Sequence, residues 1–246
     1  MSEKKSILIL GASSDMAKAT ALRYAKAGYP LVLAARDTQM LERDASDIHL
    51  RYGVSVQTVA FDVTDTASHP AFFDSLKDTV EGMISFVGFM GEQEASQKDF
   101  SQAERVVMSN YTGLVSIFEL FAADFEAKQS GFLIGVSSVA GDRGRKSNYI
   151  YGSAKAGFTA YLSGLRNRLY ASGVQVLTVK PGFVRTKMTE GMELPEKLTA
   201  EPSEVAEDIF SAQQKGKDVI YTKWFWRFIM LIITAIPEKI FKRLSL

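Results

Sequence analysis

The stretch Ile7-Leu8-Ile9-Leu10-Gly11-Ala12-Ser13-Ser14-Asp15-Met16-Ala17 contains, in order, an apolar strand, a turn and the beginning of a helix. Its four apolar residues suit a strand that is buried on both faces, and a helical pattern continues to Ala27. At such a junction the backbone N–H groups and the positive end of the helix favour an anion. The stretch therefore predicts the first unit of an α/β fold, with a phosphate-binding turn.

The alternation of strand and helix continues along the chain. Further strands are expected at Leu31–Ala35, Val54–Phe61, Gly82–Val87, Gly131–Ser137, Val174–Lys180 and Val219–Tyr221, and further helices at Met40–Tyr52, Ala67–Thr79, Phe100–Lys128, Tyr149–Ala171 and Glu204–Lys215. Strands that alternate with helices pair in parallel through right-handed crossovers. The pattern predicts a single-domain Rossmann fold, in which a doubly wound parallel sheet of about seven strands has helices on both faces.

Length and composition agree with one large domain. The chain has 246 residues, of which 46% are apolar, and this is enough for one sizeable core. We expect residues 1–222 to form the Rossmann domain and residues 223–246 to form an apolar and basic helical tail.

Charge and metal-ligand content exclude several classes of function. A net charge of +1 gives no electrostatic footprint for nucleic acid. The chain has no cysteine and only two histidines, His49 and His69, which we expect at the surface, so no metal site is predicted. The N-terminus, Met1–Lys5, has no apolar segment of signal-peptide type, and we therefore expect a cytoplasmic protein.

A second stretch carries groups suited to proton transfer. Ser137-Ser138-Val139-Ala140-Gly141 ends a predicted strand, and Tyr151-Gly152-Ser153-Ala154-Lys155 opens a helix. Residues four apart share a helix face, so the Lys155 ammonium can lie beside the Tyr151 phenol and lower its pKa. Ser138 would hold the oxygen of a reacting carbonyl. The pattern predicts a general acid/base for an alcohol or ketone, although a Tyr and a Lys at this spacing can also form an ordinary exposed pair.

Ser138 precedes Tyr151 by thirteen residues, and small residues surround Tyr151. With this context, the sequence from Ser6 to about Val219 resembles the short-chain dehydrogenase/reductase family. The resemblance implies an NAD(P)-dependent oxidoreductase that transfers a hydride between a nicotinamide cofactor and a ketone or secondary alcohol. It also implies that Ser138, Tyr151, Lys155 and Asn110 are catalytic. Asn110 matches a family residue that lies in the middle of a helix and holds a water in the proton relay through Lys155.

The resemblance implies a set of cofactor-binding residues: Gly11, Ser13, Ser14, Asp15, Met16, Arg36, Asp62, Val63, Gly88, Tyr151, Lys155, Pro181, Gly182, Val184 and Thr186. The chain departs from the family pattern at Asp15 and Ala17, where the family has glycine, and in Phe86-Val87-Gly88-Phe89, where the family has Asn-Asn-Ala-Gly. A carboxylate at position 15 should repel a pyrophosphate unless it caps the helix.

The end of the second strand bears on the choice of cofactor. Arg36 follows Ala35 where the family often has an acidic residue that binds the ribose, and an arginine there can pair with a 2′-phosphate. We expect NADP(H). Arg36 could instead stack on adenine while Asp37 reaches the ribose, so NAD(H) stays open. Asp62 matches an adenine-contacting residue of the family, but it could equally cap a turn.

Two features point to the substrate and to a partner. Arg143, Arg145 and Lys146, in the loop before Tyr151, are expected to bind a phosphate on the substrate, unless this is simply a solvated loop. The tail has two tryptophans at one end and Lys239, Lys242 and Arg243 at the other, which suits a helix at a membrane interface. Its apolar run is shorter than the about 20 residues that span a bilayer. The alternative is burial between subunits of a dimer or tetramer.

Taken together, these features resemble the decaprenylphosphoryl-2-keto-ribose reductase branch of the family. The resemblance implies a lipid-linked or otherwise amphiphilic carbonyl substrate at the cytoplasmic face of the membrane. Two alternatives remain: a soluble reductase of a small ketone or 3-oxoacyl thioester, and a non-catalytic dinucleotide-binding sensor.

Overall fold

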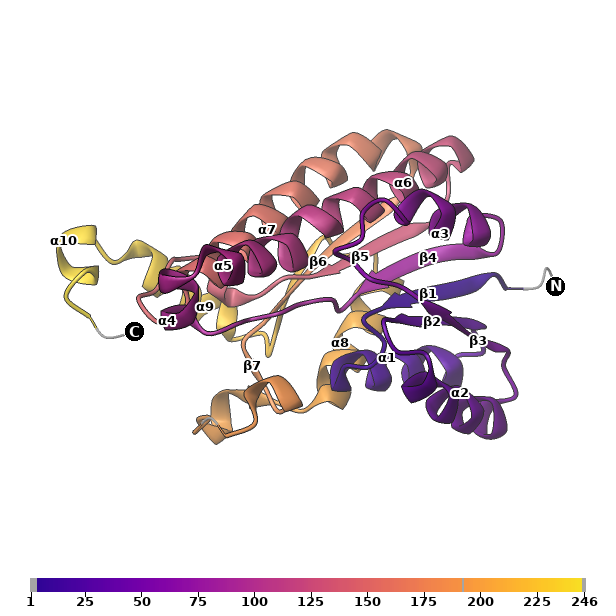
Figure 1. The fold of residues 1–246 in the computed structure, drawn as a ribbon, viewed down its shortest axis with the longest axis horizontal. Coiled ribbons are helices and arrows are strands. Elements are labelled where there is room, and N and C mark those ends of the chain that lie inside the picture. The colour runs from indigo at the N-terminus through magenta and orange to yellow at the C-terminus, as the bar shows by residue number, and fades with distance from the viewer. Residues whose placement is uncertain (1–3, 192, 245–246) are drawn as a thin grey trace.

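The central sheet has seven parallel strands in the order β3-β2-β1-β4-β5-β6-β9 (Figure 1). The computed structural model describes residues 4–191 and 193–244, so the first three residues of the expected domain and the last two of the expected tail lie outside it. The strands are β1 (Ser6–Leu10), β2 (Leu31–Ala35), β3 (Val56–Ala60), β4 (Val80–Ser85), β5 (Phe132–Val136), β6 (Gln175–Pro181) and β9 (Val219–Thr222). The doubly wound sheet expected from the alternation is confirmed.

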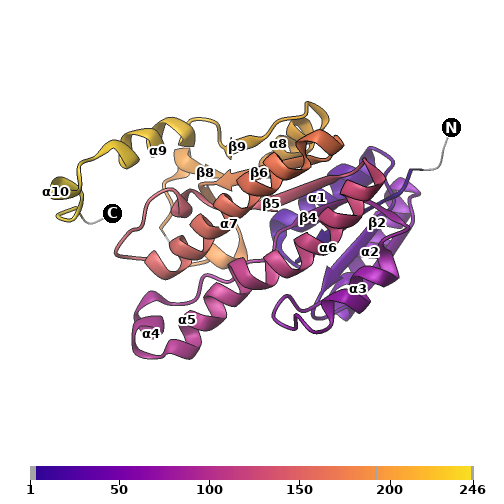
Figure 2. The same ribbon diagram turned by 90° about the horizontal axis from the view of Figure 1, so that it is seen from above.

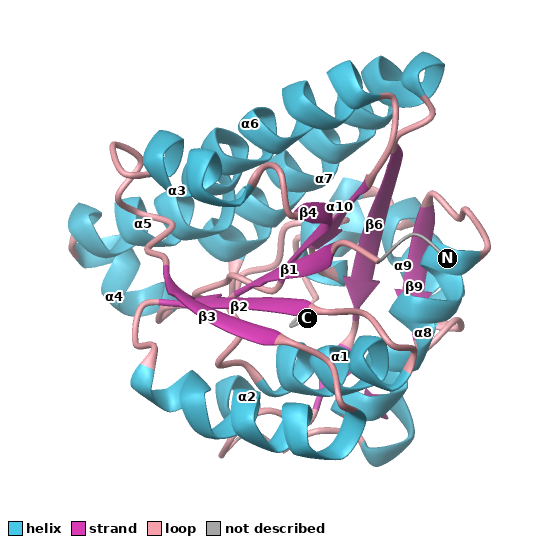
Figure 3. Cartoon of the chain, turned by 90° about the vertical axis from the view of Figure 1, so that its right-hand side faces the viewer, coloured by secondary structure: helices cyan, strands magenta, loops and turns pink. Residues whose placement is uncertain are grey.

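Helices cover both faces of the sheet (Figure 3). One face is covered by α1 (Asp15–Lys26), α2 (Gln39–Tyr52) and α8 (Pro202–Gln214), and the other by α3 (His69–Leu76), α6 (Gly113–Lys128) and α7 (Tyr149–Leu169). The strand order reverses between β1 and β4, which pair at the centre of the sheet. From β1 the chain adds strands toward one edge, ending at β3, and from β4 it adds strands toward the other edge, ending at β9. In such sheets a ligand site lies beyond the carboxyl ends of the strands at this point.

The helix expected at Phe100–Lys128 is interrupted. The structure has α5 (Phe100–Val107), a π-helical turn at Met108–Thr112, and then α6. By length and composition this run could cross a membrane, but half of its most apolar window is buried. Phe118, Phe121 and Phe125 pack in the core against the sheet, which explains the apolar composition.

Several elements have no counterpart among the predicted ones. The helix α4 (Gln93–Lys98) follows β4, and two short strands, β7 (Phe183–Val184) and β8 (Thr199–Ala200), pair with each other outside the main sheet. The strand predicted at Gly82–Val87 lies two residues too far along the chain, because β4 begins at Val80 and ends at Ser85. These short elements carry too few residues to produce a clear periodicity.

The tail forms α9 (Trp226–Ala235) and α10 (Glu238–Phe241), at the end of the molecule where α4 and α5 also lie (Figures 1 and 2). Trp226 and Met230 are buried. The Trp226 ring covers Gly182 so closely that a Cβ at that glycine would collide with it. The first turns of α9 are therefore part of the domain's packing, and the boundary at residue 222 remains a prediction.

The expectation that both histidines lie at the surface is wrong for His69. His49 is exposed, but His69 is completely buried, with Nδ1 2.9 Å from Ser116 Oγ and Nε2 3.3 Å from the Asp62 carbonyl oxygen. Its ring stacks on Phe61. Burial lowers the pKa of His69, so the neutral form joins α3 to α6.

Candidate active site

Two cavities open at the carboxyl end of the sheet. The first, of about 550 Å³, is lined by seven of the predicted cofactor residues: Gly11, Ser13, Ser14, Arg36, Asp62, Val63 and Gly88. The second, of about 680 Å³, is lined by Met16, Ser138, Arg145, Tyr151, Pro181, Gly182, Val184 and Thr186. The predicted residues thus divide into one set that suits an adenosine and one set around the reactive side chains.

The turn between β1 and α1 has the geometry of a phosphate-binding turn. Gly11 has a φ of +72°, and a Cβ there would lie 2.9 Å from the Val87 backbone nitrogen, so only glycine fits. Ser14 caps α1 by accepting a hydrogen bond from the Ala17 N–H at 3.2 Å. These residues fit a dinucleotide pyrophosphate at the helix N-terminus.

Asp15 neither caps the helix nor disrupts the turn. Its Oδ2 accepts a hydrogen bond from the Lys187 backbone N–H at 2.9 Å, in the segment that follows β7. The residue that replaces the family glycine therefore connects the start of α1 to a segment far along the chain. This interaction was not foreseen from the sequence.

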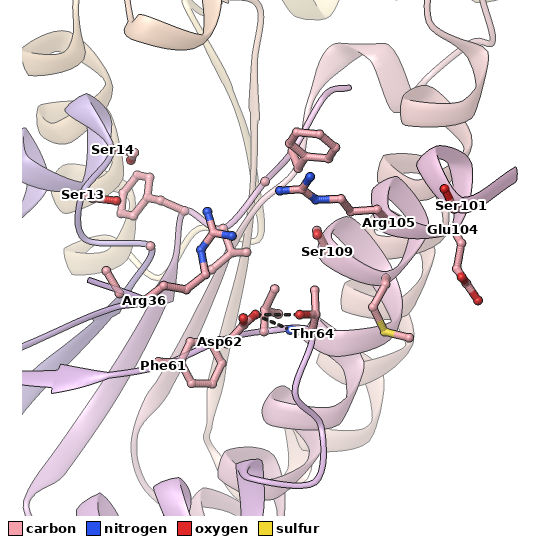
Figure 4. A pocket seen from close by; sticks show the side chains of 18 residues that line it. Ser13, Ser14, Arg36, Phe61, Asp62, Thr64, Ser101, Glu104, Arg105 and Ser109 are labelled. Atoms are coloured by element: carbon pink, nitrogen blue, oxygen red, sulfur yellow. Dashed lines mark hydrogen bonds between the residues drawn. The ribbon is translucent and has the colours of Figure 1, made fainter. Parts of the chain in front are cut away.

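The side chains around the first cavity bear on the cofactor. Arg36 and Arg105 reach into it from opposite walls (Figure 4). Asp37 is engaged at the start of α2, where its Oδ1 accepts a hydrogen bond from the Gln39 N–H at 3.0 Å. The cavity wall therefore carries the cations Arg36 and Arg105, while the Asp37 carboxylate is engaged at the start of α2. This arrangement suits a phosphorylated ribose.

Asp62 caps a turn at the edge of the first cavity, and its predicted contact with adenine stays a prediction. It lines the first cavity, and its Oδ1 accepts hydrogen bonds from the backbone and hydroxyl groups of Thr64 at 2.9 and 2.8 Å (Figure 4). Burial tends to raise the pKa of Asp62, but these hydrogen bonds and the charge of Arg36 outweigh it and lower the pKa. The carboxylate is therefore ionised beside the cavity.

Ser138, Tyr151 and Lys155 come together at the end of β5 and the beginning of α7. Ser138 and Tyr151 line the second cavity, and Tyr151 is half-buried. Lys155 is buried behind them, with Nζ 5.8 Å from the centre of the Tyr151 ring, and it donates a hydrogen bond to the Val136 carbonyl oxygen at 3.0 Å. A phenol and a hydroxyl thus face the space where a carbonyl could sit.

The expected lowering of the Tyr151 pKa is wrong. Burial raises the pKa of Tyr151 to about 12, although a hydrogen bond with the Ser138 hydroxyl acts in the opposite direction. Burial also lowers the pKa of Lys155 to about 8. Desolvation is the largest cause for both groups, and Tyr151 is a neutral phenol that can donate a proton.

Asn110 occupies the π-helical turn, and its side chain fixes the segment after β4. Its Nδ2 donates hydrogen bonds to the Phe89 and Val106 carbonyl oxygens at 2.6 and 2.8 Å, and its Oδ1 accepts one from the Phe89 N–H at 3.3 Å. A Cβ on Gly88 would lie 3.3 Å from Asn110 Oδ1 and 3.5 Å from Lys155 Nζ. The side chains of Asn110 and Lys155 therefore both approach Gly88, in the segment that lacks the family's asparagine pair.

Ser137 has a structural role that the sequence did not reveal. Its hydroxyl lies 2.7 Å from Thr159 Oγ1 and donates a hydrogen bond to the Lys155 carbonyl oxygen at 3.0 Å. It therefore anchors α7 to the end of β5 and keeps Lys155 in place. The two adjacent serines look alike in the sequence, and only their hydrogen-bond partners in the folded chain separate their roles.

The three cations predicted to bind a phosphate do not gather at one site. Arg143 donates hydrogen bonds to the Ile233, Thr234 and Ile236 carbonyl oxygens and forms an ion pair with Glu238 at 2.9 Å. Lys146 is exposed and lines neither of the two cavities, whereas Arg145 lines the second. Arg143 serves the C-terminal end of α9, so the expected cluster is not formed.

The chain is similar to known proteins over nearly its whole length. Residues 5–197 match the short chain dehydrogenase family. An uncharacterized oxidoreductase of Mycobacterium tuberculosis is 34% identical over 241 residues, covering 97% of this chain and 96% of the relative. An NADP-dependent 3-hydroxy acid dehydrogenase of Schizosaccharomyces pombe is 28% identical over 231 residues, covering 88% of this chain and 89% of the relative.

Among solved structures, a short-chain dehydrogenase from Sphingobium yanoikuyae in complex with NADPH superposes with a TM-score of 0.83 and 26% identity, over 95% of this chain and 97% of the other. The family match covers the phosphate turn, Asn110, Ser138, Tyr151 and Lys155. The chain belongs to the short-chain dehydrogenase/reductase family of NAD(P)-dependent oxidoreductases.

Proposed function

We propose that this protein is an NADP(H)-dependent enzyme that interconverts a ketone and a secondary alcohol on a small molecule. The observation that carries the proposal is the shared cavity of Ser138 and Tyr151, with Lys155 buried behind them. A sensor of dinucleotides would not need a proton donor facing an open cavity. The second candidate, a non-catalytic sensor, is therefore less well supported.

The residues divide the chemistry between them. The bound nicotinamide supplies the hydride, and the carbonyl carbon of the substrate is reduced to an alcohol carbon. Ser138 donates a hydrogen bond to the carbonyl oxygen and holds it against Tyr151. Tyr151 transfers its phenolic proton to that oxygen, and Lys155, which keeps its positive charge below about pH 8, stabilises the phenolate that remains.

NADP(H) is supported by the first cavity. Arg36 lines its wall, and Arg105 faces it from α5. The Schizosaccharomyces pombe relative is NADP-dependent by name, and the Sphingobium yanoikuyae neighbour holds NADPH. A guanidinium that pairs with the 2′-phosphate would favour NADPH over NADH.

The Arg36→Ala variant should bind NADPH at least about tenfold more weakly and NADH nearly as well as the unchanged protein, because only NADPH carries the 2′-phosphate. Titration of the nicotinamide fluorescence measures both affinities. Arg43→Ala, a change on the exposed face of α2, is the matched control. An equal loss for both cofactors would show that Arg36 contacts a part that they share, and absence of binding in the unchanged protein would refute the proposed enzyme.

For the substrate, the wider proposal is a small carbonyl compound, as in the 3-hydroxy acid dehydrogenase relative. A lipid-linked or amphiphilic substrate is a narrower proposal. The support for this narrower proposal is the exposed apolar surface of α9, a helix whose Trp226 lines the second cavity. Against it, the three cations that were expected to bind the lipid phosphate do not form a cluster, since Arg143 binds the end of α9. A soluble reductase of a small ketone or 3-oxoacyl compound fits the described site better.

We infer that the exposed side of α9 joins copies of this chain. Phe228, Leu231 and Ile232 on α9, and Trp224 just before it, each expose more than half of their surface. Apolar patches of this kind mark association surfaces. The competing role is peripheral contact with a membrane, for which the nearby Lys239, Lys242 and Arg243 are the argument.

Introducing two charges with Leu231→Glu and Ile232→Glu should reduce the mass measured by light scattering from that of an oligomer to that of one chain. Lys215→Glu, at an exposed position at the end of α8 outside the tail, is the control for charge alone. A monomeric unchanged protein that sediments with anionic vesicles, and loses this in the double variant, would favour the membrane role.

A further inference from the structure

The second cavity has polar side chains near the reactive groups that the proposed mechanism does not use. Gln93 from α4 and Arg145 and Asn148 from the loop before α7 line it, together with Ser138 and Tyr151. One side-chain atom of each of these three residues is buried without a hydrogen-bond partner: Gln93 Nε2, Arg145 Nε and Asn148 Oδ1. Buried polar atoms are usually paired, so three unpaired atoms on side chains that line one cavity leave hydrogen-bonding capacity that a ligand can use once these side chains turn toward it.

Arg145 is a cation without an anionic partner. Among the described residues it takes part in no ion pair within 4.0 Å, and its Nη2 donates only to the weak acceptor Met230 Sδ at 3.4 Å. Its side chain is half-buried, and burial lowers its pKa. Arg143, two residues earlier, has four partners. The nearby Asp142 carboxylate acts against this lowering, but it is paired with Lys180 and makes no ion pair with Arg145 within 4.0 Å. A guanidinium that is partly withdrawn from water without a direct anionic partner costs free energy, and a bound anion would offset this cost.

Gln93 supplies a second donor. Its Oε1 accepts a hydrogen bond from the Ile150 N–H at 3.1 Å, and this fixes the amide so that Nε2 is free to donate. Asn148 Oδ1 offers an acceptor close in sequence to Arg145, suited to a hydroxyl or amino group on the same ligand. Two donors, one of them charged, match the two oxygens of a carboxylate.

We propose that Arg145 and Gln93 bind a carboxylate of the substrate, so that the enzyme acts on short oxo acids and the corresponding hydroxy acids. The inference rests on the proposed function, because Ser138 and Tyr151 must hold the carbonyl of the same molecule. A single cation in the cavity wall matches the single charge of a carboxylate better than the double charge of a phosphate. Glu92 and Glu94 also line the cavity, but both are exposed.

Steady-state kinetics with the full chain and NADPH would compare 2-, 3- and 4-oxo acids, their methyl esters and a keto phosphate. We expect kcat/KM to be highest for one of the acids. In Arg145→Met it should fall about 10- to 100-fold for that acid, mainly through KM, and stay within about threefold for its ester. Arg145→Lys should recover part of the loss. Lys146→Met, which changes a neighbouring exposed cation outside the cavity, should have no effect.

A second measurement separates this inference from the proposed function. Calorimetric titration with butyrate, and with the neutral butyramide as its control, is done with and without saturating NADPH. We expect butyrate to bind and butyramide not to bind. The affinity for butyrate should be about tenfold or more weaker in Arg145→Met. Equal losses for acid and ester, a preference for the keto phosphate, or butyrate binding that is unchanged in Arg145→Met would overturn the carboxylate site. Absence of NADPH binding would refute the proposed function, and the butyrate titration would still decide whether the anion site exists.

Discussion

Tyr151→Phe should reduce ketone turnover by about 10²- to 10⁴-fold, because it removes the group that protonates the carbonyl oxygen and leaves the ring in place. Tyr151 faces the second cavity and is the phenol nearest to Lys155 among the described contacts. The loss should appear in kcat and kcat/KM alike, since the proton is transferred only in the transition state.

The measurement is NADPH oxidation with the best ketone or oxo acid, together with NADPH affinity by fluorescence. Affinity should stay within about threefold, since the change removes one hydroxyl from a site with many other contacts. Tyr149→Phe is a matched control, because Tyr149 belongs to the same helix turn but is 44% exposed and lines neither cavity. Turnover in Tyr151→Phe equal to that of the unchanged protein would contradict the assignment of the proton donor.

Asp142→Asn should lower the free energy of unfolding by about 3 kcal/mol, which is the cost of leaving a buried charge without its partner. Asp142 Oδ1 lies 2.6 Å from Lys180 Nζ, and the Tyr221 hydroxyl donates a hydrogen bond to Oδ2 at 2.9 Å. The side chains of Lys180 and Asp142 are only 11% and 10% exposed. The three residues join β6 and β9 to the loop that carries Arg143 and Arg145.

Urea unfolding and thermal denaturation measure this loss, and the expected decrease in Tm is roughly 6–12 °C for a domain of this size. Asp47→Asn, in an exposed ion pair with Arg51, is the control and should leave Tm unchanged. Combining Asp142→Asn with Lys180→Met should recover much of the stability, because the unpaired charge is then absent. A Tm for Asp142→Asn equal to that of the unchanged protein would mean that Lys180 finds water or another partner.

Most of the fold and the reactive groups followed from local sequence patterns. The apolar runs of β1, β2 and β6 predicted buried strands, because a strand covered on both faces needs continuous apolar residues. The spacing of Tyr151 and Lys155 predicted their common helix face. Gly11 predicted the turn, where the structure shows both a positive φ and a close backbone approach.

What the tertiary structure decided is which partner each polar or aromatic side chain meets. Asp15 binds the backbone of Lys187, Arg143 binds the end of α9, and Trp226 covers Gly182. Each contact joins residues more than 40 positions apart. Periodicity gives the face on which a side chain lies, but not which distant segment packs against that face. For this reason the sequence by itself determined the doubly wound parallel fold and the chemistry of Ser138, Tyr151 and Lys155. Only long-range packing placed Arg145 in the cavity wall and Arg143 at the end of α9.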